Sequence, residues 1–344
     1  MPIETFLRQM PKVELHVHLE GSIRPETLLQ LAQRHRISLP ADSLEGLRQW
    51  YQFTDFPHFA EIYLAISSCI QIPEDIELIT CEFLRHQAAQ NIVHSEVTYT
   101  PLTIFKKSGI LFHDQLAAIN RARLWGEKTL GISMTLTIDM SRELVTEEES
   151  LTVADWAISG LGNGVTGFGL GGYEVGFPPE RFKKAFDRAR AAGLASLPHA
   201  GETLGAESIW GSLRSLHAQR IGHGVRCIDD RDLIKELRDR QIPLEVCPTS
   251  NVCLKVVPNL SDHMLPSLID EGLYITINSD DPPMFNTTLN DEYCRLARAF
   301  GFSIEIFEQF ALNALRASLL PDNKRQSLEE KFKNEFLSLR IQNN

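Results

Sequence analysis

The sequence predicts one (β/α)8 TIM barrel with extra helices, a single domain over residues 1–344, and three observations support this prediction. Short apolar runs alternate with longer runs of helical periodicity, which is typical of a parallel sheet covered by helices. Eight such units fit within the 344 residues, which indicates a barrel. The polar residues of the apolar runs lie at their carboxyl ends, where barrel enzymes place their active sites. A doubly wound open sheet is the alternative architecture.

The predicted strands are short and apolar. In the first, apolar residues occupy every second position from Val13 to Leu19, which is the period of a strand. The third is rich in β-branched residues, which favour strands. No internal repeat, low-complexity segment or linker interrupts the chain, so one continuous domain is expected. Strands are expected at 13–19, 92–99, 132–139, 165–170, 194–198, 219–222, 242–247 and 273–278.

The predicted helices begin with recognisable start signals. Ser22, Pro25 and Glu26 precede the first periodic run, and a serine cap with an early proline is typical of a helix N-terminus. Three consecutive glutamates from Glu147 open a later run, where negative charge suits the helix dipole. Beyond the first run, helices are expected at 74–90, 113–130, 144–160, 179–192, 205–216, 229–240 and 262–271, and residues 288–340 look helical.

Residues 40–65 are less regular and include a short aromatic run. Phe53, Phe56 and Phe59 lie within seven positions. One interpretation is a helix that packs an aromatic stripe against the core. The other is an apolar wall beside a substrate pocket, to which Phe56 and Phe59 contribute. The sequence leaves both interpretations open.

Composition limits the possible partners. The formal net charge is −11, which argues against a nucleic-acid surface or an anionic membrane as partner. No apolar run is long enough to span a bilayer, and the N-terminus lacks the features of a signal peptide. The six cysteines form no Cys-x-x-Cys motif and suggest no disulfide framework. A reduced, cytoplasmic protein with a small-molecule substrate is expected, and the oligomeric state is left open.

Histidines and carboxylates gather at the ends of the predicted strands. His16 and His18 are two residues apart on the first strand, so their side chains share one face. Taken one at a time, the polar residues at the later strand ends can be explained as ordinary parts of loops or turns. Their joint placement at one barrel mouth instead predicts a single zinc ion with a position left for water. Another histidine and a glutamate would carry protons. The later strand ends supply His199, Glu202, His223, Asp280 and Asp281.

Two other metal chemistries are less well supported by the sequence. A binuclear barrel hydrolase commonly needs a bridging lysine at the end of the fourth strand, where this chain has Gly171 and Gly172. The His-x-Glu and Pro-Cys-x-x-Cys arrangement of cytidine-type zinc deaminases does not occur. A catalytically silent metal-binding barrel would be expected to lose Glu202 or His223, and both are present. One metal in a functional hydrolase is therefore favoured.

Four motifs together resemble the adenosine deaminase family of the amidohydrolase superfamily. They are residues 11–22, which contain Leu15-His16-Val17-His18, then His199-Ala200-Gly201-Glu202, residues 220–224, and Ser279-Asp280-Asp281-Pro282. The resemblance covers nearly the whole chain in order. It implies hydrolytic deamination of an adenine-containing nucleoside, adenosine in the first place, by attack of a zinc-activated hydroxide on purine C6.

The resemblance also implies a role for each site residue. His16, His18, His199 and Asp280 are similar to the zinc ligands, and Asp280 also takes part in catalysis. Glu202 resembles the residue that shares a proton with the ring nitrogen beside C6, and His223 the residue that moves the proton of the nucleophile. Substrate contacts are implied for a further set, which comprises His18, Glu20, Gly172 through its N–H, Asp281, Phe56 and Phe59.

One departure from the family pattern bears on the substrate. Adenosine enzymes of the family usually carry Asp where this chain has Glu20, and adenine deaminases often have Glu there. Residues 53–59, 168–172 and 278–285 resemble bacterial members that deaminate 6-aminodeoxyfutalosine, in which a carboxylated aromatic group hangs from the 5′ carbon. Deamination of 6-aminodeoxyfutalosine or of free adenine is therefore the alternative to adenosine.

Overall fold

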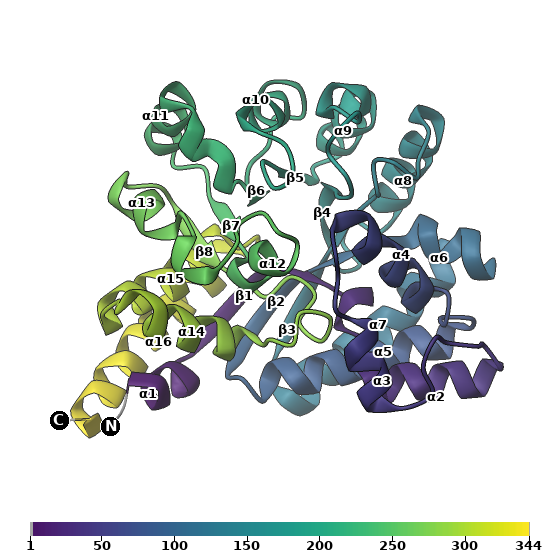
Figure 1. The fold of residues 1–344 in the computed structure, drawn as a ribbon, viewed down its shortest axis with the longest axis horizontal. Coiled ribbons are helices and arrows are strands. Elements are labelled where there is room, and N and C mark those ends of the chain that lie inside the picture. The colour runs from purple at the N-terminus through teal and green to yellow at the C-terminus, as the bar shows by residue number, and fades with distance from the viewer. Residues whose placement is uncertain (1–2, 344) are drawn as a thin grey trace.

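Eight parallel strands in sequence order form the centre of the molecule. The computed structural model describes residues 3–343, and its strands pair in the order β1 to β8 (Figure 1). This order confirms the predicted (β/α)8 barrel, and the doubly wound alternative is wrong because that fold reverses its strand order. The strands are β1 Lys12–His18, β2 Ile92–Tyr99, β3 Ser133–Ile138, β4 Val165–Leu170, β5 Ala195–Ala200, β6 Ile221–His223, β7 Leu244–Val246 and β8 Ile275–Ile277.

The segment after β8 joins the last strand to the first. The His18 N–H donates to the Asp280 carbonyl at 2.9 Å, and the Asp280 N–H donates to the His16 carbonyl at 3.1 Å. Below this point the Asn278 side chain accepts from the N–H groups of Leu15 and His16 at 3.0 and 3.1 Å. The barrel is thus nearly closed, and closure brings β1 beside Asp280.

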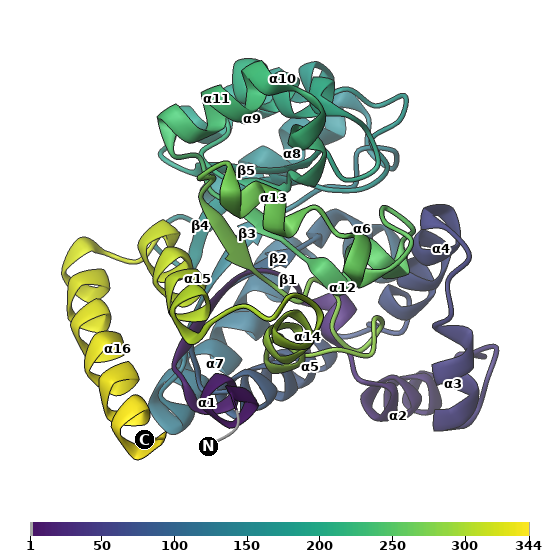
Figure 2. The ribbon, with the colours of Figure 1, turned by 60° about the vertical axis from the view of Figure 1, so that its left-hand side comes forward.

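Helices surround the strands and cover the apolar core. The first and the last helix lie side by side, because α1 packs against α16 as well as against α14 (Figures 1 and 2). None of the helices among residues 3–343 is long and apolar enough to cross a membrane. The helices are α1 Ile3–Gln9, α2 Pro25–His35, α3 Leu44–Trp50, α4 Phe56–Ser67, α5 Pro73–Ala88, α6 Pro101–Ser108, α7 Phe112–Leu130, α8 Glu147–Ser159, α9 Lys183–Ala191, α10 Ala206–Ser215, α11 Arg231–Arg240, α12 Pro248–Cys253, α13 Leu265–Asp270, α14 Leu289–Phe300, α15 Ile304–Ala317 and α16 Asp322–Asn343.

Capping residues explain where several helices begin. Thr146 and Glu149 form a capping box, so α8 begins at Glu147. Asp55 accepts from the His58 N–H at 2.9 Å and caps α4. The predicted serine cap of α2 is wrong. Ser22 belongs to a 3-10 turn and its hydroxyl donates to the His18 carbonyl at 2.6 Å, while Pro25 begins the helix as predicted.

The C-terminal region is divided rather than continuous. Gly301 has a φ of 64° at the end of α14, a conformation that glycine adopts without strain. The chain then turns into α15, which packs on β8 and β1, and finally into α16 (Figure 2). Because α15 packs on β8 and β1, it serves as the helix of the eighth unit, and α14 and α16 are among the additional helices.

Candidate active site

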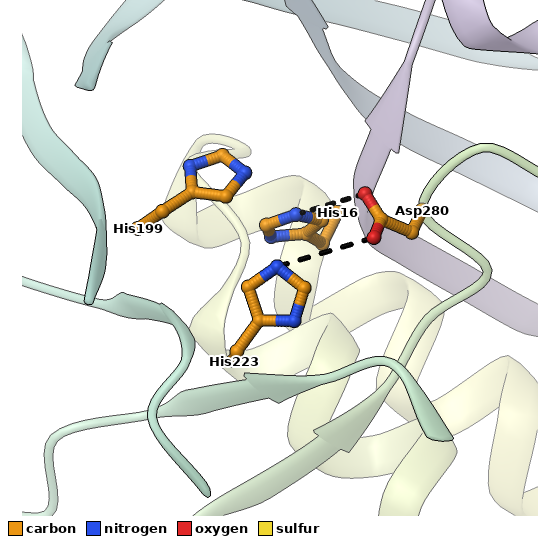
Figure 3. A group of neighbouring side chains, drawn as sticks. All are labelled: His16, His199, His223 and Asp280. Atoms are coloured by element: carbon orange, nitrogen blue, oxygen red, sulfur yellow. Dashed lines mark ion pairs between the residues drawn. The ribbon is translucent and has the colours of Figure 1, made fainter. Parts of the chain in front are cut away.

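The strand ends bring the predicted site residues together at one mouth of the barrel. His16 and His18 come from β1, His199 from β5 and His223 from the last position of β6. Asp280 follows β8. Figure 3 shows the imidazoles of three of these histidines and the carboxylate of Asp280 turned toward a common space. Only the side chain of His18 among the five is more than slightly exposed, at 12%.

The distances between these side chains suit a metal centre. The Nε2 atoms of His16 and His18 lie 3.4 and 3.3 Å from Asp280 Oδ1, and the Nε2 atoms of His18 and His199 lie 3.2 Å apart. Ligands about 2.1 Å from a tetrahedral ion are separated by roughly 3.4 Å. His223 Nε2 is farther away, at 3.9 Å from Asp280 Oδ2 (Figure 3). Among the described residues, the ligand atoms of His16, His199, His223 and Asp280 all lie within 4.8 Å of one another, and His18 forms a second such group with Asp280 and Asp281. The predicted donors His16, His18, His199 and Asp280 are ordinary zinc ligands by chemistry, and the spacing brings His223 into the same cluster.

A buried carboxylate orients the His16 ring. His16 Nδ1 lies 2.9 Å from Glu245 Oε2, so Nδ1 carries the proton and Nε2 presents a lone pair. Among the residues that the structure describes, His16 Nε2 is buried without a hydrogen-bond partner. Glu245 is held by Arg220, whose Nε lies 2.5 Å from Glu245 Oε1. An unpartnered buried nitrogen aimed at three other donors is what a metal ligand requires.

A second buried carboxylate fixes the loop that carries Glu202. Glu174 accepts backbone N–H bonds from Gly201, Glu202 and Thr203 at 2.9, 2.9 and 2.8 Å. Gly201 has a φ of 69°, so the turn after β5 requires glycine or a strained residue. With the loop anchored in this way, the Oε2 atom of Glu202 lies 3.7 Å from the Nε2 atom of His223.

Glu202 and Asp281, two of the acidic groups at the mouth, have pKa values shifted toward their neutral form. Burial and the nearby Asp280 and Glu174 carboxylates raise the pKa of Glu202 well above its ordinary value. Burial and the adjacent Asp280 likewise raise the pKa of Asp281. Burial lowers the pKa of His223 to about 4. The two pKa shifts thus favour the neutral forms of Glu202 and of His223, which lie side by side.

Two glycines make room at this mouth. A Cβ atom on Gly21 would lie 1.6 Å from Asp281 Oδ1, so only glycine lets that carboxyl group take its position. Asp281 Oδ1 has no hydrogen-bond partner within the described chain, although it is buried. Gly172 has a φ of 83°, and its backbone lines the cavity directly. Asp281 and Gly172 can both offer polar contacts to a ligand.

A cavity with a polar floor and an apolar wall opens above these residues. It encloses about 630 Å³ of empty space, part of which is open to solvent. Phe56 and Phe59 on α4 line it, and their rings pack against Tyr173 and Phe285 at 5.6 and 5.4 Å between centroids. The remaining lining residues are His18, Ala60, Tyr63, Leu64, Thr100, Asp139, Ser141, Glu143, Leu144, Gly171, Gly172, His199, Glu202, His223, Leu254, Asp280 and Asp281.

Glu20 lies behind the cavity and not in its lining. Its carboxylate accepts from the Thr100 N–H at 2.9 Å and from the Tyr63 hydroxyl at 3.2 Å, and both of these residues line the cavity. Burial raises the pKa of Glu20 to about 7. Glu20 thus shapes the wall through Thr100 and Tyr63.

The sequence prediction missed several residues of the site. Asp139 directly follows β3 and lines the cavity, and burial raises its pKa to about 6. The sequence could have identified Asp139 as a site residue, because it directly follows a predicted strand, as His199 also lies at a strand end. Glu174 and Glu245 gave no such signal, because their partners lie on strands or loops that are distant in the sequence.

Comparison with known proteins gives one consistent family. Residues 11–335 match the family model described as "Adenosine deaminase". An aminodeoxyfutalosine deaminase of Streptomyces avermitilis is 41% identical over 319 residues, which cover 92% of this chain and 89% of that protein. An adenine deaminase of Crocosphaera subtropica is 38% identical over 326 residues, 95% of this chain and 99% of that protein. The solved structure of an amidohydrolase from Burkholderia ambifaria with bound Zn is 28% identical, with a TM-score of 0.91 over 98% of this chain and 94% of that one.

Proposed function

The chain belongs to the adenosine deaminase family and is a hydrolytic deaminase of adenine-containing compounds, and we propose that its substrate is 6-aminodeoxyfutalosine. Adenosine, the first expectation from the sequence, is less well supported than its alternative. Relatives named for 6-aminodeoxyfutalosine and for adenine match more than nine-tenths of the chain. The observation that carries the deaminase proposal is the meeting of Glu202 and His223 beside the His/Asp cluster at the cavity floor.

We further propose that one zinc ion is held by His16, His18, His199 and Asp280. Their spacing and the unpartnered Nε2 of His16 support this set. Three histidines and a carboxylate are ordinary zinc ligands, and a zinc ion held by them would have to expand to five ligands to take up a water. When bound, the ion supplies Lewis acidity that lowers the pKa of water toward neutrality. Glu245 fixes the orientation of the His16 ring so that its Nε2 atom faces the proposed ion.

Glu202 and His223 move the protons of the reaction. Because its pKa is raised, Glu202 can hold a proton and donate it to the ring nitrogen beside the amino-bearing carbon. That ring nitrogen then accepts the electron pair displaced when water attacks the carbon. Neutral His223 can take the proton released by the water. His223 then gives the proton it took to the amino group, which leaves as ammonia. The remaining hydroxyl proton returns to Glu202, so one water is consumed and a 6-oxo purine is formed.

Asp281 and Gly172 hold the purine in place. Asp281 is buried with a raised pKa, so its carboxyl group can donate a hydrogen bond to the five-membered-ring nitrogen, which is an acceptor. The Gly172 backbone lines the cavity and can donate its N–H to another ring nitrogen. Phe56 and Phe59 cover the apolar faces of the bound base. These contacts fix the position of the purine, and therefore of the carbon that water attacks.

Free adenine is the second candidate substrate. The adenine deaminase of Crocosphaera subtropica supports it. Glu20 supports it as well. Its side chain reaches Thr100 and Tyr63 in the cavity wall, and a shorter aspartate there would leave more room for a sugar.

Ammonia release from the zinc-loaded protein tests both candidates. 6-Aminodeoxyfutalosine, adenine and adenosine are offered separately at equal concentration. We expect the highest kcat/KM for 6-aminodeoxyfutalosine. A lead for adenine would replace the first candidate by the second, and no reaction with any of the three while zinc is bound would contradict the deaminase proposal.

A further inference from the structure

The side chain of Arg142 is fully buried beside the barrel mouth, outside the cavity lining, and no step of the proposed reaction uses it. We propose that Arg142 is a positioning residue of the deamination site, which holds the carboxyl ends of β4 and β5 in a fixed relation through their backbone carbonyls. This inference rests on the proposed deaminase function and assigns a role in it to a residue that does not line the substrate cavity.

The guanidinium group of Arg142 donates to four backbone carbonyls around two neighbouring strand ends. Its Nη2 atom lies 2.7 Å from the His199 carbonyl oxygen on β5 and 3.4 Å from that of Leu170 on β4. Its Nε atom lies 3.1 Å from the Gly171 carbonyl oxygen, and its Nη1 atom 3.3 Å from that of Phe177. A rigid planar fork with five N–H groups is what lets one side chain reach both strand ends.

Each of these strand ends carries a group of the proposed reaction. His199 is a proposed zinc ligand, and its own carbonyl is the one that Arg142 binds at the shortest distance. Gly172 follows Gly171 directly and is proposed to offer its N–H to the purine. A displacement of about 1 Å between such groups can cost roughly 100-fold in rate. Arg142 is placed to prevent a displacement of the metal ligand relative to the bound base.

Glu174 holds the same turn from its other side. Arg142 binds the carbonyl of His199, whereas Glu174 accepts from the N–H groups of Gly201 and Glu202 at 2.9 Å each. A cation on a carbonyl and an anion on N–H groups are both charge-assisted hydrogen bonds, which are stronger than neutral ones. Arg142 and Glu174 thus form a clamp around residues 199–202.

The two charges of this clamp act on each other without direct contact. Burial raises the pKa of Glu174, but the Arg142 guanidinium and the hydrogen bonds to the carboxylate outweigh burial and lower it. None of the ion pairs among residues 3–343 includes Arg142. The backbone of the turn therefore lies between the cation and the anion and is held by both.

A role in stability alone does not account for the charge of Arg142. Burial lowers its pKa, and the surrounding carboxylates, of which Glu174 acts most strongly, oppose this shift only in part. A buried cation without a directly contacting carboxylate costs free energy of folding, and an apolar side chain of similar size would serve stability better. The charge is instead spent on carbonyls of the strand ends that carry the site.

Two substitutions of Arg142 test the role. Arg142→Lys keeps the charge but loses the fork, and Arg142→Met loses both. Because His199 loses support, we expect zinc affinity in competition with a chelator to fall about tenfold in Arg142→Lys and about 100-fold in Arg142→Met. The KM of the preferred substrate should rise about fivefold in both, because the Gly172 N–H is displaced. Arg181→Met is the matched control, since Arg181 donates only to the Val145 carbonyl, at 3.4 Å, and it should match wild type.

A double variant tests the clamp. Arg142→Met and Glu174→Gln should each lower kcat of the zinc-saturated protein about tenfold, because either change frees the turn that carries Glu202. Residues that hold one turn together are not independent, so the loss in the double variant should be smaller than the product of the single losses. A loss equal to that product would mean that the two residues act separately, and would overturn the clamp.

The measurements separate positioning from folding and from the proposed function. Each variant is assayed below its Tm, and if Arg142→Met does not fold, Arg142→Lys decides by the same two measurements. A lower Tm with wild-type zinc affinity and KM would show a merely structural role and overturn the inference. Ammonia release from none of the three substrates by zinc-loaded wild type would overturn the proposed function, while the zinc affinities would still show whether Arg142 supports His199.

Discussion

Two buried groups of charged side chains lie within the same barrel, and they differ in how their charges are balanced. Below the mouth, Arg220 lies between Glu96 and Glu245, with contacts of 2.7 and 2.5 Å. At the mouth, Glu202, Asp280 and Asp281 have no lysine or arginine as ion-pair partner among residues 3–343. The lower group, Arg220 with Glu96 and Glu245, therefore contains its own cation. The upper group, Glu202 with Asp280 and Asp281, has no such lysine or arginine within the same range of residues.

The pKa values reflect this difference. Burial raises the pKa of Glu96, but the Arg220 guanidinium, His94 and the Leu319 N–H together outweigh burial and lower it to about 2. The pKa of Glu202 moves the other way, because burial and neighbouring carboxylates act together. A charged group that is fully paired stabilises the position of its neighbours, whereas an unpaired one is available for a metal ion or a proton. The upper group is therefore suited to chemistry and the lower one to support.

The largest effect is expected when the proton carrier at the mouth is changed. Glu202→Gln removes the acidic proton but keeps the size of the side chain. We expect kcat to fall about 10³-fold or more, roughly 4 kcal/mol in the barrier, with the bound zinc retained. Ammonia release and metal content measure the two parts. Glu207→Gln, an exposed residue on α10, is the control, and activity within tenfold of wild type in Glu202→Gln would remove Glu202 from the mechanism.

Breaking the lower group should cost stability. Arg220→Met leaves Glu96 and Glu245 buried without their cation, for which about 3–5 kcal/mol of unfolding free energy is expected to be lost. Urea unfolding measures the loss. The matched control is Arg238→Met, which removes an exposed pair with Glu271 and should cost at most about 1 kcal/mol. Equal losses in the two variants would mean that the lower group is not a support.

A third buried charge sharpens the comparison because its partners are backbone carbonyls. Lys12 Nζ donates to the carbonyls of Met10 and Gln90 at 2.6 and 3.2 Å, and burial lowers its pKa from 10.5 to about 7. Between these pH values the unfolded chain holds a proton that the folded chain has lost, so folded stability rises with pH.

The difference in unfolding free energy between wild type and Lys12→Met isolates this contribution. It should grow in favour of wild type by about 2–4 kcal/mol from pH 7 to pH 10. Subtraction removes the titration of the cysteines, which are common to both proteins. A difference that does not change with pH would show that Lys12 stays charged in the folded barrel.

The smallest effect is expected where the two groups meet. Glu245 contacts both Arg220 and His16, so Glu245→Gln weakens the orientation of a proposed zinc ligand without removing it. We expect zinc affinity to fall 10- to 100-fold, about 1–3 kcal/mol, in competition with a chelator. Glu236→Gln on the exposed face of α11 should bind zinc like wild type, and an unchanged affinity in Glu245→Gln would separate the lower group from the site.

The sequence predicted the parts of the molecule that depend on local pattern. Strand periodicity located all eight strands, and residues such as His199 and His223 could be assigned to the mouth because they end those strands. Partnerships between distant segments could not be predicted in this way. Glu174 reaches the backbone of Glu202 across two loops, and Glu245 reaches His16 across the barrel.

The position of Glu20 shows the same limit. The family pattern implies a substrate contact at this place, which stays a prediction, and the structure adds that the carboxylate accepts from the Thr100 N–H and the Tyr63 hydroxyl. Whether a side chain lines a cavity or lies behind it depends on packing in three dimensions, which no spacing in the sequence encodes.

The central claim is that the unbalanced group at the mouth is a single metal site that performs deamination. Metal-free protein is titrated with zinc while ammonia release from 6-aminodeoxyfutalosine is followed. The account predicts that activity rises from zero and reaches its plateau at one zinc per chain. A plateau at two ions per chain, or zinc bound at one per chain with no ammonia released, would contradict it.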